Sequence, residues 1–452
     1  MKNNWIMYRN GTIRLLRHSW FLLVCLMVWN GGLFAQVSVE PLSPEALQKL
    51  EALYKHLHQN PELSYYEHNT AARLAQEMRT LGLEVTEGVG GTGVVAVLKN
   101  GDGPTVMVRT DMDALPIIEK TGAPYASRVR VKTQSGEEVG VMHACGHDIH
   151  MTVWVGTAKK LLQERNRWRG TVVFIAQPAE ERGGGAKAML EDGLYERFPL
   201  PDYVIALHVN SQLPVGKISY VPGYAMANVE SMDITVFGKG GHGAYPHTTI
   251  DPIVLSAKII MNLQTIVSRE IAPIDPAVVT VGSIHGGTKH NIIPDKVHMQ
   301  LTLRSYSDEV RHALVDKIRR ICKGEAIAAG LPDSLHPHIT TSEFTPAVYN
   351  DPKLVQTVVD AFKARYGDDN VLHAKPVMGG EDFSHYGRTK ERIPIFMFGL
   401  GVVNPEFYES CQQKGIAPPS AHSPFFLPDY KPSIRMGIDA MSTAVMTLLR
   451  TH

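Results

Sequence analysis

The residues from Met142 to Asp148 have the types and the spacing of a metal site. Cys145 and His147 stand two positions apart, with Gly146 between them. Both side chains can reach one ion only if this stretch is a strand or a loop, because positions two apart point to nearly opposite sides of a helix. Thiolate and imidazole are favoured ligands of zinc and suit other first-row divalent ions. The alternative is a buried cysteine beside surface histidines.

Two adjacent carboxylates, Glu180 and Glu181, lie just beyond the apolar run 171–176. Such a pair is usually solvated. Beside a metal ion the two can divide the work, because one can bind the ion while the other takes a proton from water and passes it to the leaving amine. Their position after a predicted strand favours this second interpretation.

Several single residues gain meaning only as a group. His208, Asp111 and Asp113 each follow an apolar run, and His422 lies in the stretch Ser-Ala-His-Ser-Pro. A lone histidine is more often a surface or core residue than a ligand. We expect Asp113 to hydrogen-bond a ligand imidazole and hold its orientation.

The elements that must position these residues alternate between strands and helices. Apolar runs predict strands over 94–98, 105–108, 171–176 and 203–207, and helical patterns cover 44–58, 67–81, 151–162 and 186–190. This alternation predicts an α/β fold with a mainly parallel sheet covered on both faces. Ligands bind beyond the carboxyl ends of strands in such sheets, which is where the polar clusters fall.

The length of 452 residues exceeds what one core organises, since a single core stops growing at roughly 250 to 300 residues. From about residue 223 the pattern becomes α+β, with strands over 231–237, 278–284 and 297–304 and helices over 252–268 and 308–329. The α/β pattern then resumes with elements over 352–366, 394–398 and 434–449. We predict a catalytic domain made of residues 36–222 and 338–452, with a domain inserted at 223–337.

Residues 1–35 have the features of a cleavable signal peptide. A cationic start precedes the apolar stretch Trp20 to Trp29, and Ala35 offers a small residue for cleavage. The stretch is short for a membrane span, so we predict export to the periplasm without a stable membrane anchor. A lipoprotein at Cys25 is the weaker alternative, because Val24 is a poor neighbour for that modification.

Charge and cysteine content exclude some classes of protein. Lysine plus arginine (45) equal aspartate plus glutamate (45), so no net field recruits nucleic acid. Three cysteines remain after the signal segment, which is too few for a disulfide framework: Cys145, Cys322 and Cys411. The glycine-rich run 88–93 precedes a strand and is interpreted as a turn, and 282–286 is no nucleophile elbow.

Seven short motifs together resemble the M20 metallopeptidases. They appear in the family's order at 56–62, 111–116, 143–148, 178–181, 240–246, 291–294 and 379–383. The likeness covers nearly the whole chain after residue 35. It is strongest to the amidohydrolase branch, which includes hippurate hydrolases, N-acetyl-amino-acid deacetylases and plant auxin-conjugate hydrolases.

The resemblance implies a zinc-peptidase-like catalytic domain that holds two divalent metal ions. The positions that match the metal ligands are Cys145, His147, Glu181, His208 and His422. Glu180 matches the general base, and Asp113 matches the aspartate that steadies the site. In the peptidase branches the position of Asp111 is a histidine ligand and the bridging ligand is an aspartate; here a cysteine follows the amidohydrolase pattern, which leaves manganese, zinc, nickel or cobalt open.

The resemblance also implies that the inserted domain is a dimerisation or lid domain that helps to bind substrate. His242, Asn291 and Arg304 match residues that receive the substrate carboxylate or the oxyanion, His242 from the partner subunit of a homodimer or larger homo-oligomer. A strand-end surface charge is the alternative for Arg304. Gly379 and Gly380 would let the backbone approach a ligand.

The predicted activity is metal-dependent hydrolysis of the amide bond of N-acyl-L-amino acids, with acetyl, benzoyl or similar acyl groups. Two alternatives remain open. One is an aminopeptidase or dipeptidase of the same family. The other is a catalytically silent periplasmic peptide-binding protein, which would have no need of a base at Glu180.

Overall fold

The computed structural model describes residues 40–132 and 136–449. The predicted signal segment, residues 1–35, lies outside this range. No helix within the described residues is long and apolar enough to cross a membrane.

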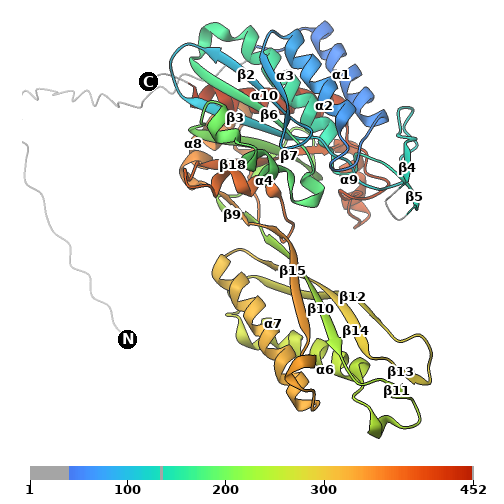
Figure 1. The fold of residues 1–452 in the computed structure, drawn as a ribbon. Helices are drawn as coiled ribbons and strands as arrows, with labels where there is room; N and C mark the ends of the chain where they lie inside the picture. Colours follow the sequence, from blue (N-terminus) through green and yellow to red (C-terminus); the bar gives the residue numbers. More distant parts are fainter. Residues whose placement is uncertain (1–39, 133–135, 450–452) are drawn as a thin grey trace, which may run out of the picture. The chain divides into compact units, whose positions relative to one another are not determined.

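The described residues form ten α-helices and eighteen strands, several of them very short (Figure 1). The helices are α1 (Pro44–Gln59), α2 (His68–Thr80), α3 (His147–Gln163), α4 (Gly185–Glu191), α5 (Leu194–Arg197), α6 (Pro252–Thr265), α7 (Asp308–Ala328), α8 (Pro352–Tyr366), α9 (Pro405–Gln413) and α10 (Tyr430–Leu448). The strands of the first half are β1 (Glu84–Val89), β2 (Gly93–Asn100), β3 (Thr105–Asp111), β4 (Arg130–Lys132), β5 (Glu138–Gly140), β6 (Gly170–Gln177), β7 (Tyr203–Pro214), β8 (Ile218–Tyr220) and β9 (Gly223–Met226). The others are β10 (Asn228–Phe237), β11 (Gly241–His242), β12 (Ala277–Gly286), β13 (Ile292–Ile293), β14 (Lys296–Ser305), β15 (His338–Thr345), β16 (Val348–Asn350), β17 (Val371–His373) and β18 (Ile395–Val403).

The larger sheet of the described chain has eight strands in the order β1-β2-β6-β3-β7-β18-β8-β17. Its central pairs, β6 with β3, β3 with β7 and β7 with β18, are parallel. The carboxyl ends of parallel neighbours meet at one edge of a sheet. The mainly parallel α/β sheet predicted from the sequence is therefore confirmed.

Helices cover both faces of this sheet because its strands are apolar on both sides. Successive strand residues point to opposite faces. On β3, Val106 and Val108 join the core shared with α1, α2, α3, α8 and α10, whereas Met107 joins the core shared with α4 and α5. The strands are nearly continuous apolar runs for this reason.

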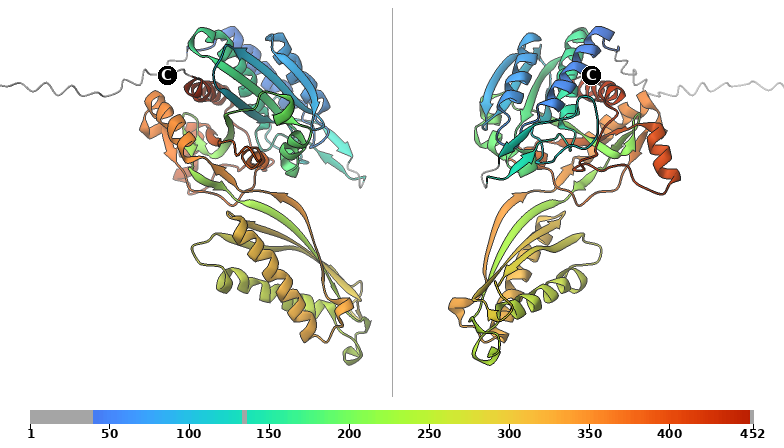
Figure 2. Two further views of the ribbon diagram at one scale, coloured as in Figure 1. Left: turned by 60° about the vertical axis from the view of Figure 1, so that its left-hand side comes forward. Right: turned by 90° about the vertical axis from the view of Figure 1, so that its right-hand side faces the viewer.

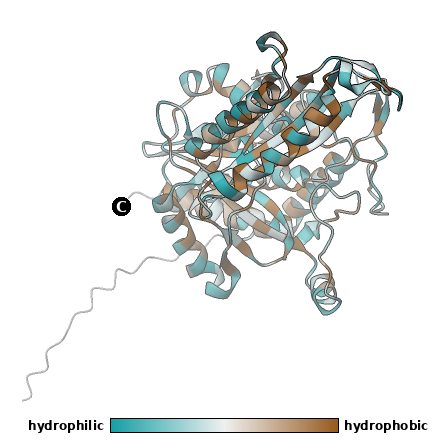
Figure 3. Cartoon of the chain, turned by 90° about the horizontal axis from the view of Figure 1, so that it is seen from below, coloured by the Kyte–Doolittle hydropathy of each residue, from teal (hydrophilic) through white to brown (hydrophobic). Residues whose placement is uncertain are grey.

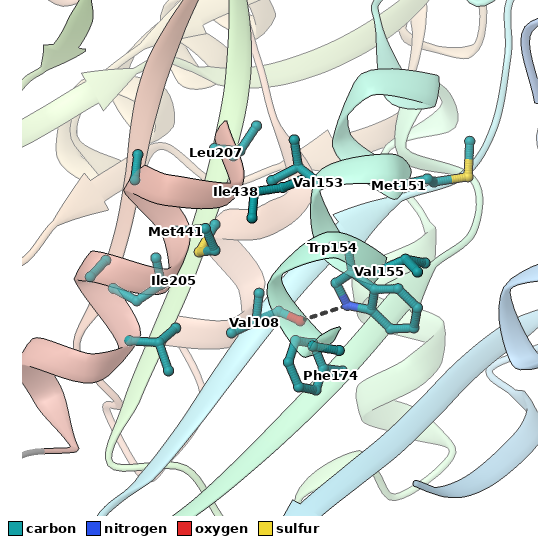
Figure 4. Packing of buried hydrophobic residues seen from close by; sticks show 14 of the residues in the cluster. Val108, Met151, Val153, Trp154, Val155, Phe174, Ile205, Leu207, Ile438 and Met441 are labelled. Atoms are coloured by element: carbon teal, nitrogen blue, oxygen red, sulfur yellow. Dashed lines mark hydrogen bonds between the residues drawn. The ribbon is translucent and has the colours of Figure 1, made fainter. Parts of the chain in front are cut away.

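Packing anchors α3 on the sheet. The Trp154 indole Nε1 donates a hydrogen bond of 3.2 Å to the carbonyl oxygen of Val108, and its ring meets Phe174 of β6 edge-on, with 5.7 Å between centroids (Figure 4). Val153 lies close to Ile438 of α10 in the same core. The first turn of α3, which carries His147, is thereby set against the sheet.

A second sheet of four antiparallel strands has the order β12-β14-β10-β15. Helices α6 and α7 lie side by side against one of its faces (Figure 2) and share one apolar core with it. Each helix mixes apolar and polar positions, as the hydropathy colouring of Figure 3 shows for the helices of the chain. This unit is the α+β pattern expected from residue 223 onward.

The domain boundaries stay a prediction, since residues 36–452 group into one compact unit. Strand β15 begins at residue 338, the predicted start of the second catalytic segment, yet it pairs with β10 of the four-stranded sheet. The strand pairing thus favours an inserted segment that ends near residue 345.

Most predicted elements appear within a few residues of their expected ends, with three informative differences. Helix α3 begins at His147 instead of Met151, and α6 ends at Thr265, followed by a π-helical turn (Ile266–Glu270). Helix α9 was not predicted. The run 88–93 is a turn between β1 and β2, and 282–286 lies on β12, so neither is a second functional motif.

Candidate metal centre

The ends of β3 and β6 and the middle of β7 bring the predicted site residues to one edge of the sheet. Asp111 is the last residue of β3 and pairs with Gln177, the last residue of β6. Strand β7 runs on past His208, so this histidine lies within the strand rather than after it; the pairing of Arg109 with Ala206 puts it level with Asp111.

Cys145 lies in the turn before α3, and His147 is the first residue of that helix. Gly146, between them, has a left-handed backbone with φ of 81°. A β-carbon at this position would lie 2.6 Å from the side chain of Val209, so only glycine fits. The predicted non-helical link between the two ligands is therefore a single left-handed glycine.

The structure brings all five predicted metal ligands together in two overlapping groups. Ligand atoms of Cys145, His147 and His208 lie within 4.8 Å of one another, and so do those of Cys145, Glu181 and His422. Cys145 belongs to both groups. Its Sγ lies 3.4 Å from His208 Nε2, and His422 Nε2 lies 3.5 Å from Glu181 Oε1. We call these five residues the candidate metal centre.

Two atoms of the candidate metal centre are buried without a hydrogen-bond partner among the described residues. They are His147 Nε2 and Glu181 Oε1. A buried polar atom without a partner costs roughly 1–3 kcal/mol, and folded proteins seldom leave one so. Nitrogen and carboxylate oxygen are both common ligands of divalent ions. The donor set thus fits a metal ion.

Hydrogen bonds on the far side of two imidazoles turn their free nitrogens toward this centre. His147 Nδ1 donates to the main-chain oxygen of Asp113 (2.8 Å), and His208 Nδ1 donates to the main-chain oxygen of Val209 (2.8 Å). In each ring Nε2 is then left to accept, which is how metal-binding histidines are usually held.

Asp113 contacts both the His147 imidazole and the turn that carries the two glutamates. Its main-chain oxygen, not its carboxylate, accepts the hydrogen bond from His147, whose Nδ1 is 3.5 Å from the carboxylate. The carboxylate accepts instead from the main-chain N–H groups of Glu180 (3.1 Å) and Glu181 (3.0 Å) and from Ser64 Oγ (2.6 Å). Asp113 therefore fixes the turn that carries both glutamates.

The backbone around the centre is strained. Ala179, just before Glu180, has φ of 47°, and His422 has φ of 67°. The main-chain N–H of His422 donates to the carbonyl oxygen of Ala144 (2.8 Å), which ties the His422 loop to the cysteine turn. Non-glycine residues in this region of backbone space persist only where the surroundings hold them, and they cluster at functional sites.

The charges in the centre shift its pKa values. Burial by itself raises the pKa of Cys145, but the imidazoles of His208 and His147 outweigh it and lower that pKa well below its usual value. Burial, then the neighbouring Glu381 and Glu181, raises the pKa of Glu180 well above its usual value. Burial and the Cys145 charge raise the pKa of Glu181 to about 8. The raised pKa values of the two glutamates reflect the crowding of acidic groups in the centre, and a bound cation would offset this repulsion.

A second buried polar cluster surrounds Arg109, and the sequence analysis missed it. The guanidinium donates to Asp111 (2.6 Å), Glu381 (2.8 Å), Asp382 (3.2 Å) and Gln177 (3.0 Å). We call these five residues the Arg109 cluster. An arginine within an apolar strand was the available signal, because a charge is almost never fully buried without partners.

Asp111 and His150 are already paired with other residues. Asp111 accepts from His150 Nδ1 (2.7 Å) as well as from Arg109, and His150 Nε2 accepts from the main-chain N–H of Val209 (2.9 Å). Burial outweighs Asp111 and lowers the pKa of His150 to about 4, which keeps the ring neutral. Although these two form a cluster with His147, they support the centre rather than offer free ligand atoms.

The predicted substrate-binding residues fall into two places. Arg304 lies beside Gly380, where a β-carbon would come within 3.3 Å of Arg304 Nη1 and 2.1 Å of Val229. The carbonyl of Gly379 accepts from the main-chain N–H of Ala227 (2.9 Å).

His242, on β11, and Asn291, directly before β13, lie together elsewhere. His242 pairs with Ile292, and the main-chain N–H of Gly243 donates to the Asn291 oxygen (2.9 Å). Both residues are exposed. No contact among the described residues joins them to the candidate metal centre.

The protein is therefore an α/β protein whose mainly parallel sheet carries a candidate metal centre of cysteine, histidine and glutamate at one edge. Residues 107–427 match the sequence profile of peptidase family M20/M25/M40, and the chain belongs to this family. It is therefore a hydrolase.

Named relatives share most of the chain's length. Thermostable carboxypeptidase 2 of Saccharolobus solfataricus is 38% identical over 373 residues, 82% of this chain and 88% of that protein. N-acetylcysteine deacetylase of Bacillus subtilis is 38% identical over 360 residues, 79% of this chain and 89% of that protein. The crystal structure of Bacillus subtilis YXEP, described as a dinuclear metal binding peptidase from the M20 family, is similar with a TM-score of 0.73 and 31% identity, over 91% of this chain and 100% of that one.

Proposed function

We propose that the protein hydrolyses the amide bond of N-acyl-L-amino acids with two divalent metal ions per subunit. Cys145, His147, Glu181, His208 and His422 would hold the ions. The observation that carries this proposal is the pair of buried, partnerless atoms, His147 Nε2 and Glu181 Oε1, inside a cluster of ligand-type side chains. A similar structure described as dinuclear and a relative named a deacetylase support it.

Cys145 belongs to both ligand groups, so its thiolate would be a ligand of the metal centre together with the histidines and the glutamate of either group. The lowered pKa of Cys145 favours the thiolate. Manganese or zinc is the expected ion, with nickel or cobalt also compatible with sulfur, nitrogen and oxygen donors. Metal analysis of the purified protein, followed by chelation and reloading with each ion, identifies the active form.

Glu180 is proposed as the general base and acid. When bound, divalent ions polarise water and the substrate carbonyl. Glu180 takes a proton from the attacking water, whose oxygen bonds to the acyl carbon; as the carbon–nitrogen bond breaks, Glu180 returns that proton to the departing nitrogen. Asp113 holds the Glu180 main chain in place through its hydrogen bond of 3.1 Å.

Arg304 is proposed to receive the substrate carboxylate, because its guanidinium offers the planar fork that carboxylates prefer. Gly380 lets Arg304 and Val229 pack against the main chain, since a β-carbon there would lie 2.1 Å from Val229. His242 would act from the partner subunit of a homodimer and Asn291 would help to bind the substrate, with residues 223–337 serving as the dimerisation or lid domain. Both residues are exposed, which is consistent with that role.

A peptidase acting on unblocked peptides is the second candidate, favoured by the likeness to a carboxypeptidase. The test compares hydrolysis of N-acetyl and N-benzoyl amino acids with that of unblocked dipeptides by the metal-loaded enzyme. Glu180→Gln should keep its metal content while kcat falls by at least about a thousandfold, because the base is lost. Preference for dipeptides with a free amine, or near-normal turnover by Glu180→Gln, would reject the proposal.

Export to the periplasm is the remaining part of the proposal, and it depends on residues 1–35 alone. Cell fractionation with N-terminal sequencing tests it. A mature chain that begins at Gln36 in the periplasmic fraction is expected; an intact Met1 in the cytoplasmic fraction would contradict it.

A further inference from the structure

Tyr65 has a strained backbone beside the candidate metal centre. Its φ is 70°, a left-handed conformation that is an outlier for a bulky residue. Four non-glycine residues of the described chain have positive φ, and two of the others are Ala179 and His422, at the centre itself; Arg392 is the fourth. Such strain persists where the surroundings impose it, and it points to a function.

Shared carboxylates fasten the Tyr65 loop to the catalytic loop. The main-chain N–H of Tyr65 donates to Glu67 Oε1 (3.0 Å), and the same oxygen accepts from the main-chain N–H of Ala179 (2.8 Å). Ser64 Oγ donates to Asp113 (2.6 Å), the carboxylate that also holds the turn of the two glutamates. Tyr65 is therefore held rigidly with respect to the turn that carries the proposed base.

About half of the Tyr65 residue is exposed to solvent. The residue is 53% exposed, and its hydroxyl lies against Gly184, where a β-carbon would approach within 2.3 Å. Among the described residues its ring stacks on no other aromatic ring, and its hydroxyl makes no hydrogen bond. Gly184 follows the Glu180–Arg182 turn closely, so the Tyr65 hydroxyl lies against the end of the turn that carries the proposed base.

We propose that Tyr65 determines acyl-group specificity and favours substrates with an aromatic acyl group, of the benzoyl class. This inference rests on the proposed function. Aromatic rings attract one another in offset-stacked or edge-to-face arrangements, which an acetyl group cannot form. A ring that is already immobilised loses little further conformational freedom when it binds. The strain at Tyr65 then serves to present that face to the substrate.

The test measures kcat/KM of the metal-loaded enzyme on the N-benzoyl and N-acetyl derivatives of the same amino acid. The wild type should prefer the benzoyl compound. Tyr65→Ala should lower the benzoyl-to-acetyl ratio by about tenfold, whereas Tyr65→Phe should keep it within about twofold because the ring remains. The matched control is Tyr66→Ala, since Tyr66 is the next residue and is 57% exposed, and it should leave the ratio unchanged.

Three outcomes would overturn the inference. They are an equal loss on both substrates in Tyr65→Ala, a ratio change of the same size in Tyr66→Ala, and a loss on both substrates in Tyr65→Phe, which would make the hydroxyl the acting group. If Tyr65→Ala does not fold, Tyr65→Leu removes the flat face and keeps apolar bulk. A wild type that cleaves neither compound rejects the proposed function as well, whereas a wild type that cleaves both with an unchanged ratio in the variant rejects only the role of Tyr65.

Discussion

Two buried polar clusters lie close together at one edge of the large sheet, and they differ in how completely their atoms are paired. In the Arg109 cluster, none of the side-chain nitrogen or oxygen atoms is buried without a hydrogen-bond partner. The candidate metal centre is equally buried at Cys145 and His147, yet it leaves His147 Nε2 and Glu181 Oε1 without one. The polar atoms of the Arg109 cluster are thus paired within the fold, whereas the candidate metal centre keeps two unpaired atoms that could bind a ligand.

Buried polar atoms without partners mark the part of a polar region where a ligand can bind. In a cluster whose polar atoms are all hydrogen-bonded within the fold, a substitution should lower the free energy of unfolding. In a cluster with unpaired polar atoms, a substitution should weaken ligand binding and activity. It should change the stability of the metal-free protein only slightly.

Removing the shared ligand should produce the largest effect. Cys145→Ala is expected to lower bound metal and to reduce kcat/KM on the order of a thousandfold or more, since the ions supply the activated water. With chelator present, its free energy of unfolding should change by only about 1 kcal/mol, because a small side chain is lost.

Metal analysis, steady-state kinetics and urea unfolding measure these quantities. Cys411→Ala is the matched control, because Cys411 is also a buried free cysteine but lies on α9. Full metal content and activity in Cys145→Ala would remove this residue from the centre.

Disrupting the saturated cluster should have the opposite signature. Arg109→Met leaves Asp111, Glu381 and Asp382 buried without their cation, and breaking a buried ion pair in this way costs about 3–5 kcal/mol. Urea unfolding of the metal-free protein gives the loss. The comparison variant is Arg197→Met, whose ion pair with Asp192 is exposed and should contribute less than about 1 kcal/mol. Equal stabilities of the two variants would contradict the distinction drawn between the clusters.

A third buried ion group, at His58, should give a smaller and pH-dependent effect. His58 Nδ1 lies 2.6 Å from Asp148 Oδ2, and its Nε2 lies 3.2 Å from Glu119 Oε1. Burial lowers the pKa of His58, but the hydrogen bonds and charges of Asp148 and Glu119 outweigh it and raise that pKa to about 9.

Because the folded-state pKa of His58 lies above its unfolded value of about 6.5, the stabilisation should be full below that pH and lost as the pH rises through about 9. The difference in unfolding free energy between wild type and His58→Gln, measured with chelator, should therefore shrink by roughly 2–3 kcal/mol from pH 6 to pH 9.5. A difference that does not change over this range would show that His58 is not charged in the fold.

Local pattern was sufficient for much of the architecture. Helix α8 has its predicted ends, and β3, β6 and β7 begin within a residue of expectation, because apolar periodicity is a local property of the chain. The start of α3 was missed by four residues. Its first turn carries His147 and Asp148 in a fully buried position, and burial of polar residues there hides the helical period.

The contacts within the candidate site were harder to predict from local sequence patterns than the helices and strands were. The five predicted ligands could be named from motifs, but no motif contains Arg109, and the motifs do not reveal that it pairs with residues 381 and 382. Asp113 shows the same limit, since its residue type suggested a bond to an imidazole and its carboxylate instead holds the glutamate turn. Such pairings depend on which distant segments meet.

The chain's order of residues was enough to establish the α/β class, the family and the chemical types available for a metal centre, because these depend on composition, spacing and short motifs. Tertiary structure alone decided that Cys145 meets both His208 and His422, that His147 Nε2 is left without a hydrogen-bond partner, and that the Tyr65 backbone is strained. The physical reason is that hydrogen bonding and burial act between segments that are far apart in the chain, and only the packed fold determines their partners.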